Sequence, residues 1–222
     1  MTMTTKKIII YGPGGFGREA AWLIQNCKSN NDTIEIVGFI DDNLDTHGSS
    51  LNEIPIMGLS EAHAKFSDAK IVCGIGAPAI REKLMQKAKE LGFESQYFIH
   101  QNVEISKWVT VGEGSLICAG NIITTNIAIG EHVHLNLDCT VGHDVIIGDY
   151  STISPGVHIS GYVQMGKRVF IGTGANILNG TKETPLIIED DAVVGAGACV
   201  TKSVASGTTV VGIPAKPLQE RR

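Results

Sequence analysis

An aliphatic residue recurs at every sixth position through the second half of this chain. The series runs without a gap through Ile105, Val111, Ile117, Ile123, Ile129, Leu135, Val141, Ile147, Ile153, Ile159, Met165, Ile171 and Ile177. Neither a helix nor an alternating strand keeps a period of six, so the pattern predicts a repeat architecture. Short strands joined by sharp bends would stack each aliphatic residue on the one below and build a one-dimensional core.

The six-residue rhythm is interrupted once. The position six residues after Ile177 is the polar Glu183, and the aliphatic series resumes at Ile188. We therefore expect an external loop at one corner of the repeat, near residues 182–187. Loops on repeat scaffolds often line binding surfaces.

The first hundred residues alternate strand-like and helix-like segments instead. Strands are expected at 7–11, 35–40 and 95–99, a strand with its following loop at 70–76, and a short extended edge piece at 54–57. Helices are expected at 18–27, 61–66 and 79–91. Ser60 is the expected N-cap of the second helix and Gly92 the expected C-cap of the third. This alternation predicts a small parallel α/β domain. We expect it to span residues 1–102, with the repeat domain spanning 103–222.

A glycine-rich loop joins the first strand to the first helix. It reads Gly12-x-Gly14-x-x-Gly17, in which the glycines let the backbone approach a diphosphate at the helix N-terminus. The acidic pair Asp41-Asp42 ends the second strand, where a ribose-binding acid is expected. A nicotinamide dehydrogenase is disfavoured because the α/β part is too short for a complete dinucleotide fold. The diphosphate of a nucleotide sugar fits better, and a glycine turn that only packs the helix on the sheet remains the alternative.

Composition narrows the function classes further. The net charge is −5, with mixed signs and no basic stripe, which argues against nucleic-acid binding because phosphate contacts need clustered Lys and Arg. The apolar runs are too short to span a membrane, and the N-terminus has no secretory signal pattern, so we expect a cytoplasmic protein without a membrane partner. The five cysteines lack paired spacing and predict neither a disulfide framework nor a zinc site.

Four histidines lie within the repeat, at His132, His134, His143 and His158. Their spacing does not match the zinc site of γ-type carbonic anhydrases, so no metal is expected. His143 stands out because Asp144 follows it within an otherwise regular unit. An imidazole can take a proton from an attacking amine or hydroxyl, and a neighbouring carboxylate can fix its tautomer. On these residues alone, a surface or interface histidine is the simpler interpretation.

Several segments together resemble a known family. They are Gly12-Pro13-Gly14-Gly15-Phe16-Gly17-Arg18-Glu19, Gly38-Phe39-Ile40-Asp41-Asp42, Gly74-Ile75-Gly76 and Gly142-His143-Asp144. Combined with the hexapeptide repeat, they are similar to bacterial sugar acetyltransferases of the PglD/NeuD type, over nearly the whole chain. The resemblance implies a small Rossmann-like parallel α/β domain followed by a left-handed parallel β-helix, in a homotrimer that uses acetyl-CoA. The handedness comes from the resemblance and not from the spacing.

The resemblance also implies roles for individual residues. His143 corresponds to the catalytic base and Asp144 to its acidic partner, while Gly161 would offer its N–H to the thioester carbonyl. Acetyl-CoA would lie between adjacent β-helices, against Gly161, Gly180, Ala198, Lys202 and Lys216. The nucleotide sugar would lie against Gly12, Gly14, Gly15, Phe16, Gly17, Asp41, Asp42 and Gly76. Thr152 stands where some members carry a second histidine, which leaves a mechanism with a single base.

These features predict an acetyl-CoA-dependent N-acetyltransferase acting on the amino group of a nucleotide-linked amino-deoxy sugar. Its product would enter bacterial glycan biosynthesis, for example that of lipopolysaccharide. A sugar O-acetyltransferase acting on a sialic acid-like acceptor and a non-catalytic nucleotide-binding trimer are the alternatives. Cys139 lies four residues before His143 and is interpreted as a buried thiol, because a deprotonated amine can attack the thioester directly.

Overall fold

The computed structural model describes residues 5–27 and 33–218. The chain divides into two compact units, residues 1–101 and 102–222, each of which is described by itself. Within the described ranges, no helix has both the length and the apolar character needed to cross a membrane.

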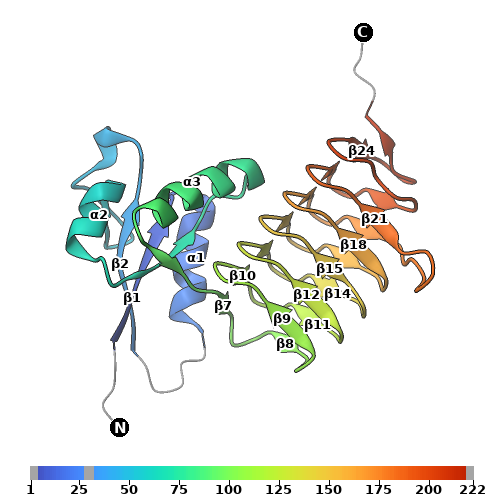
Figure 1. Ribbon diagram of the computed structural model, residues 1–222, viewed down its shortest axis with the longest axis horizontal. Coiled ribbons are helices and arrows are strands. Elements are labelled where there is room, and N and C mark those ends of the chain that lie inside the picture. Colours follow the sequence, from blue (N-terminus) through green and yellow to red (C-terminus); the bar gives the residue numbers. More distant parts are fainter. Residues whose placement is uncertain (1–4, 28–32, 219–222) are drawn as a thin grey trace. The chain divides into compact units, whose positions relative to one another are not determined.

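The first unit is an α/β sheet with helices packed against it (Figure 1). Its elements are β1 (Thr5–Tyr11), α1 (Gly15–Gln25), β2 (Thr33–Ile40), the 3-10 helix η1 (Leu44–Thr46), β3 (Ser50–Leu51), β4 (Ile54–Met57), α2 (Leu59–Lys65), β5 (Lys70–Cys73), α3 (Pro78–Glu90), β6 (Glu94–Ser95) and β7 (Phe98–Ile99). The strand order is β3-β4-β2-β1-β5-β6. The β3–β4 pair is antiparallel, and the pairs from β4 to β6 are parallel.

The position of β1 in the sheet explains its composition. Ile8, Ile9 and Ile10 have no exposed surface, as expected for a central parallel strand that is covered on both faces. After β1 the chain continues to β2 on one side, and after β5 it continues to β6 on the other. The carboxyl ends of β1 and β5 therefore form the switch point at which open α/β sheets bind ligands.

The ends of the helices differ in part from the sequence expectations. The expected N-cap at Ser60 is wrong, because α2 begins at Leu59 after Gly58 and uses no side-chain cap. α1 begins at Gly15, earlier than expected, because the glycine loop itself turns into the helix. After α3, Leu91 is the cap residue and Gly92 adopts a φ of +94°, the left-handed conformation that commonly ends helices.

The second unit is a parallel β-helix with three sheets (Figure 1). The first sheet contains β8 (Glu104–Ile105), β11 (Ile122–Ile123), β14 (Thr140–Val141), β17 (His158–Ile159), β20 (Asn176–Ile177) and β23 (Cys199–Val200). The second contains β9 (Val109–Val111), β12 (Ile127–Ile129), β15 (Ile146–Ile147), β18 (Val163–Met165) and β21 (Leu186–Ile188). The third contains β10 (Leu116–Ile117), β13 (His134–Leu135), β16 (Thr152–Ile153), β19 (Phe170–Ile171), β22 (Val193–Val194), β24 (Thr209–Val211) and the antiparallel β25 (Lys216–Pro217).

The six-residue rhythm corresponds to one side of each coil. Ile105 pairs with Ile123 and Ile123 with Val141, so each residue lies beside the residue 18 positions further on. The aliphatic residues point inward and stack; Leu135 and Ile153, for example, have no exposed surface. Burial of this continuous ladder is the main source of the unit's stability.

A residue with positive φ turns every corner of the β-helix from Gly114 to Gly174. Such residues occur at every sixth position with φ between +54° and +78°, at Gly114, Gly120, Asn126, His132, Asp138, Asp144, Tyr150, Gly156, Tyr162, Arg168 and Gly174. This left-handed conformation costs an L side chain about 1–2 kcal/mol, which explains the frequent Gly, Asn and Asp at these positions.

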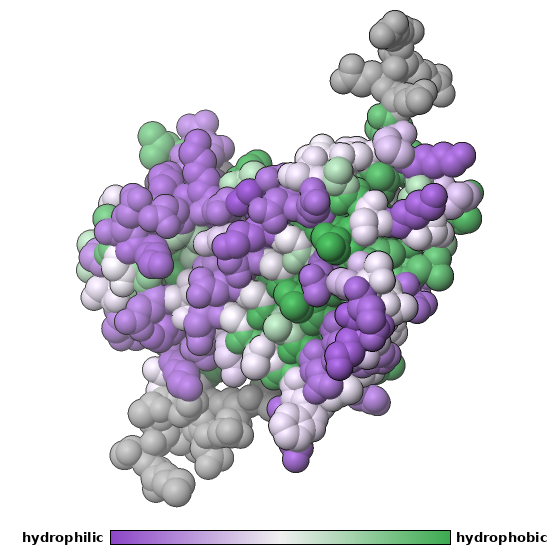
Figure 2. Space-filling view, turned by 45° about the vertical axis from the view of Figure 1, so that its right-hand side comes forward, coloured by the Kyte–Doolittle hydropathy of each residue, from purple (hydrophilic) through white to green (hydrophobic). Residues whose placement is uncertain are grey.

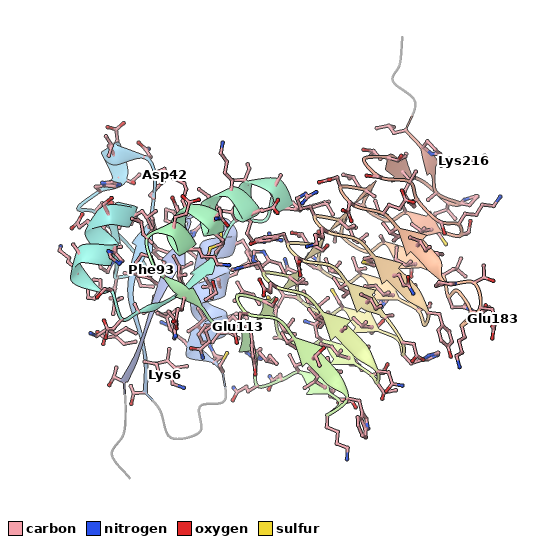
Figure 3. All side chains as sticks on the ribbon, in the orientation of Figure 1. Lys6, Asp42, Phe93, Glu113, Glu183 and Lys216 are labelled. Carbon is pink, nitrogen blue, oxygen red and sulfur yellow. The ribbon has the colours of Figure 1, made fainter. Side chains whose placement is uncertain are left out.

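The external loop lies between β20 and β21. It occupies residues 178–185, so the expected range of 182–187 is displaced, and Leu186 and Ile187 belong to β21. Met165 pairs with Ile188, a step of 23 residues in place of 18, and the additional residues form the loop. Glu183 marks this loop in Figure 3.

Buried polar side chains link neighbouring coils. The amide of Asn121, which has no exposed surface, donates to the carbonyls of Cys118 (2.7 Å) and Asn136 (2.8 Å). Its oxygen accepts the N–H of Cys139 at 3.2 Å. Ser151 has the same function further along, since its hydroxyl accepts the N–H of Val169. These contacts satisfy backbone groups at corners, where the strand ladder is interrupted.

We expect Asn121→Ala to lower the free energy of unfolding by about 1–3 kcal/mol, because it leaves buried backbone groups without partners. Urea unfolding followed by circular dichroism measures the change. Asn176→Ala is the matched control, because the Asn176 amide is exposed and bonds only locally to Gly174. Equal effects of the two substitutions would contradict this explanation.

Candidate active site

His143 and Asp144 form a hydrogen-bonded pair at a corner between the first and second sheets. The Nδ1 atom of His143 lies 2.8 Å from Oδ2 of Asp144. Asp144 is one of the left-handed corner residues, with a φ of +56°. The contact assigns the Nδ1 proton to the bond with the carboxylate, which leaves Nε2 with its lone pair. The His143 side chain is 53% exposed, so a substrate can reach this nitrogen.

Gly161 lies directly beside the His143 ring. A Cβ atom at Gly161 would come within 2.6 Å of both Cε1 and Nε2 of the imidazole, so the ring occupies the space that any larger residue would need. The Tyr162 ring meets the imidazole edge-on, with centroids 5.0 Å apart. The backbone N–H of Tyr162 also donates to the carbonyl of His143. The next coil therefore holds the imidazole from one side.

Asn126 supports Asp144 from the preceding coil. Its amide Nδ2 donates to Oδ1 of Asp144 at 3.4 Å, while the other carboxylate oxygen accepts from His143. Asn126 lies 18 residues before Asp144 at the same corner and also has positive φ. Asn126 was not among the residues expected from the sequence, although the 18-residue coil would have placed it beside Asp144.

The residues expected to hold acetyl-CoA lie at two different corners. The N–H of Gly180 donates to the carbonyl of Gly161 at 3.1 Å, and Lys202 follows β23 at the same corner as His143. Ala198 lies at the corner between the third and first sheets, and its side chain is fully buried. Lys216 is exposed on β25, at the edge of the third sheet beside Val211 (Figure 3). One chain therefore does not bring Ala198 and Lys216 to His143.

The glycine loop of the first unit is closely packed at its ends and open in its middle. A Cβ atom at Gly17 would lie 1.9 Å from the carbonyl oxygen of Gly12, and one at Gly74 would lie 2.4 Å from Cα of Gly17. Gly14 and Gly15 have no neighbouring atom within 4 Å of a built Cβ. The expected diphosphate residues thus form one tight turn whose outer part, at the start of α1, is accessible.

Arg81 fixes the second glycine loop of the switch point. Its side chain has no exposed surface, and Nη1 donates to the carbonyls of Ile75 (2.7 Å) and Gly76 (3.3 Å). Gly76 was among the site residues expected from the sequence, whereas Arg81 was not. The feature of the sequence that could have indicated Arg81 was its charge, on the helix that follows this loop.

Asp41 organises the loop after β2. Its carboxylate accepts the N–H of Asn43 and the hydroxyl of Thr46, both at 3.0 Å. Its carbonyl oxygen lies 2.8 Å from Nε2 of His47. Both carboxylate oxygens therefore already have partners within the loop.

Asp42 joins β1 to α3 through two further contacts. Its carboxylate accepts from the Tyr11 hydroxyl at 2.5 Å and from the Lys87 ammonium at 2.8 Å. Partial burial raises the pKa of Asp42, but the bonds from Lys87 and Tyr11 outweigh it and hold the pKa below its usual value. Burial, followed by the bond to Asp42, raises the pKa of Tyr11. Sequence analysis missed Tyr11 and Lys87, because residues this far apart in sequence share no local pattern.

A cavity of about 580 Å³ lies beside this cluster within the first unit. It is lined by the loop after β2, the start of α2 and the end of α3, including Asp42, His47, Ser60 and Lys87. Its volume is in the usual range for small-molecule sites.

Among residues 5–27 and 33–218, no group of three or more His, Cys, Asp or Glu side chains is placed to hold a metal ion. All five cysteines are free. Burial raises the pKa of the Cys139 thiol to about 11, and its sulfur lies 3.2 Å from the carbonyl of Ser154. A thiol in this state is a poor nucleophile.

Known proteins resemble this chain in both units. The PglD N-terminal domain family matches residues 7–88. The GDP-perosamine N-acetyltransferase of Escherichia coli O157:H7 is 33% identical over 212 residues, which cover 95% of each chain. The chain belongs to the PglD/NeuD-type family of bacterial sugar acetyltransferases. It is therefore an acetyltransferase that uses acetyl-CoA, as the motifs predicted.

Solved structures agree with this assignment. WeeI from Acinetobacter baumannii AYE superimposes with a TM-score of 0.86 at 38% identity, covering 97% of this chain and 100% of that one. PerB from Caulobacter crescentus, in complex with CoA and GDP-perosamine, gives a TM-score of 0.84 at 26% identity, covering 99% and 100%. The predicted fold, a Rossmann-like α/β unit followed by a left-handed parallel β-helix, is confirmed for this sugar acetyltransferase.

We expect Asp42→Asn to lower the midpoint of thermal unfolding at pH 7, with a difference from the unaltered enzyme that shrinks as the pH falls below about 4. The folded pKa of Asp42 is lowered, so its stabilisation is present above the unfolded pKa and is lost as the pH falls through the folded one. Scanning fluorimetry between pH 3 and 8 measures this. Glu35→Gln, at an exposed position of β2, is the control. A difference that persists at low pH would contradict the electrostatic explanation.

Proposed function

We propose that this enzyme transfers the acetyl group of acetyl-CoA to the amino group of a nucleotide-linked amino-deoxy sugar, with His143 as the base. The observation that carries the proposal is the His143–Asp144 pair, in which Nδ1 is bound to a carboxylate and Nε2 lies beside Gly161. Similarity over both units to enzymes named for perosamine N-acetylation, one of them in complex with CoA and GDP-perosamine, supports the amine acceptor.

The reaction needs one proton carrier. Nε2 of His143 takes a proton from the sugar amine as its nitrogen attacks the thioester carbonyl, and a C–N bond forms. The tetrahedral intermediate then expels the CoA thiolate as the C–S bond breaks. The thiolate takes the proton back from His143, which returns the base to its starting state. No acyl-enzyme is needed, in keeping with the buried state of Cys139.

Asp144 and Gly161 assist this transfer, Asp144 through the base and Gly161 through the oxyanion. Asp144 keeps the proton on Nδ1 and stabilises the imidazolium that forms during attack. Asn126 holds Asp144 through the second carboxylate oxygen. The N–H of Gly161 would donate to the oxyanion of the tetrahedral intermediate, at the point where negative charge develops.

The first unit would bind the nucleotide. Gly12, Gly14, Gly15, Phe16 and Gly17 lead into α1, whose first turn has no acidic residue and no side-chain cap. This arrangement favours a diphosphate at the helix N-terminus. Gly76, fixed by Arg81, borders the same switch point. Because the oxygens of Asp41 and Asp42 have partners within the protein, we expect these residues to contact the ribose or base only by sharing those bonds.

We propose a homotrimer in which acetyl-CoA lies between two β-helices. One copy would supply Gly161, Gly180 and Lys202, and its neighbour would supply Ala198, from the corner between the third and first sheets, and Lys216, from the edge of the third sheet. Exposed apolar residues on the outer faces of the sheets support such packing: Ile122, Ile146 and Ile187 are 45%, 48% and 40% exposed. Figure 2 shows apolar residues gathered on the surface of the β-helix, as expected for an interface.

The substrates indicate the place of the reaction. We propose that it occurs in the cytoplasm, where acetyl-CoA and nucleotide sugars are available. An aminotransferase reaction on a nucleotide-linked keto sugar must supply the amine. A glycosyl transfer that builds lipopolysaccharide or another bacterial glycan would use the product.

Thiol release from acetyl-CoA with GDP-, UDP- and dTDP-linked amino sugars tests the reaction. We expect turnover with one of them, and a loss of about 10²–10⁴-fold in kcat for His143→Ala because the general base is removed. Cys139→Ala is the control and should stay within a few-fold of the unaltered enzyme. Unchanged turnover in His143→Ala would exclude the proposed base, and activity restricted to hydroxyl acceptors would favour O-acetylation.

Gly161→Ala should remove most of the activity while the protein remains folded. The added methyl would meet the imidazole, an exposed side chain that can move away, so the ring would leave its position. Gly142→Ala makes a useful contrast, since its methyl would meet the backbone of Ser160 and Gly161 at 2.8 Å and should lower stability as well. Acetyl transfer and thermal unfolding are measured side by side. An active Gly161→Ala enzyme would contradict this geometry.

A further inference from the structure

Tyr162 is a large aromatic residue at a corner where the backbone favours small ones. Its φ is +57°, in the left-handed region that Gly, Asn and Asp tolerate best. Three other corner residues are equally ill-suited to this conformation, namely His132, Tyr150 and Arg168. Each of them has a specific partner, since the rings of His132 and Tyr150 stack on each other and Arg168 is bound to the carboxylate of Asp191. The partner of Tyr162 is the imidazole of the proposed base.

The backbone of Tyr162 is held from both neighbouring coils. Its N–H donates to the carbonyl of His143 at 3.1 Å, and its carbonyl accepts the N–H of Leu186 at 3.0 Å. Gly180 also passes so close that a Cβ atom there would lie 2.6 Å from the Tyr162 carbonyl oxygen. A strained corner persists where its surroundings over-determine it. Because backbone contacts hold this corner, a change of the Tyr162 side chain leaves the corner in place.

The Tyr162 ring adds a second contact to an exposed imidazole. The His143 side chain is 53% exposed, and its Nδ1 forms a 2.8 Å hydrogen bond with Asp144. A hydrogen bond at one end of a ring lets the ring pivot about that end. The Tyr162 ring lies at 86° to the imidazole with the centroids 5.0 Å apart, an arrangement that aromatic pairs favour. It blocks the pivot on that side and keeps Nε2 beside Gly161.

We propose that Tyr162 positions the base, because its ring holds the imidazole of His143 in the orientation that directs Nε2 to the acceptor amine. This inference rests on the proposed function, in which Nε2 takes the proton. The contact is made between rings, so the reaction depends on the aromatic plane and not on the hydroxyl. Tyr162 touches neither substrate in this proposal and acts through His143. The enzyme keeps an unfavourable corner residue because its ring improves catalysis, an exchange of stability for activity.

Kinetics with matched corner substitutions test this role. Tyr162→Gly removes the ring and suits the positive φ, so the protein should remain folded. We expect kcat to fall roughly 10- to 100-fold, as for a misplaced catalytic group, with KM for both substrates within a few-fold. Tyr162→Phe should keep most of kcat.

Tyr150→Gly is the control for this substitution. Tyr150 has a φ of +60° at another corner, and its ring stacks on His132 with the centroids 4.9 Å apart. Its removal should leave kcat within a few-fold of the unaltered enzyme. An unchanged kcat in Tyr162→Gly would overturn the proposal, as would an equal loss of kcat in Tyr162→Phe or in Tyr150→Gly.

Nitrogen NMR of the histidine rings tests the contact without any substrate. The chain has seven histidines, and His143→Gln identifies the signals of His143 by their loss. At about pH 9, where histidine side chains are ordinarily neutral, we expect the unaltered enzyme and Tyr162→Phe to keep the proton on Nδ1, next to Asp144. In Tyr162→Gly the ring would leave Asp144 for part of the time, so the signals should shift towards the tautomer with the proton on Nε2.

Identical His143 signals in the three proteins would overturn the positioning role. Silence of the unaltered enzyme towards every amino sugar, with the tautomer shift present, would instead refute the proposed function.

Discussion

The structure depends on a single backbone requirement, a left-handed residue at every sixth position. Each such residue turns the chain by one corner, so three of them close a coil and bring residue i beside residue i + 18. Because the turn lies in the backbone, any residue that tolerates positive φ can occupy it, and its side chain is free for another task. Asp144 occupies one of these corners. A left-handed corner of the fold and the carboxylate proposed to assist His143 thus share one position.

Coil stacking then determines what surrounds His143. The preceding coil supplies Asn126 to the second carboxylate oxygen of Asp144, and the following coil places Gly161 and Tyr162 beside the imidazole. The pair therefore sits within a ladder of backbone bonds whose spacing is fixed. Such rigidity keeps Nε2 in one orientation without a buried pocket. Exposure of the ring is compatible with catalysis because neighbouring coils, and not burial, restrict its motion.

In the α/β unit, close packing of backbone segments and contacts between charged side chains fix the loops. Glycines at three crossing points let the β1 and β5 loops touch through their backbones, which leaves the start of α1 accessible. The carboxylate of Asp42 joins β1, the loop after β2 and α3 through Tyr11 and Lys87. A buried arginine, Arg81, fixes the second loop. These contacts hold the switch point of the sheet in shape before any ligand arrives.

The sequence by itself determined the elements whose signal is local. The period of six, the interruption after Ile177 and the glycine loop each follow from neighbouring residues, and all lie close to where they were expected, apart from the cap at Ser60 and the loop limits. Tertiary structure alone decided which distant side chains meet. Nothing in the pattern around Asp42 indicated Lys87 or Tyr11. The reason is physical. Periodicity reports the local conformation of each residue, whereas a contact between two distant side chains depends on the path of the whole chain that separates them.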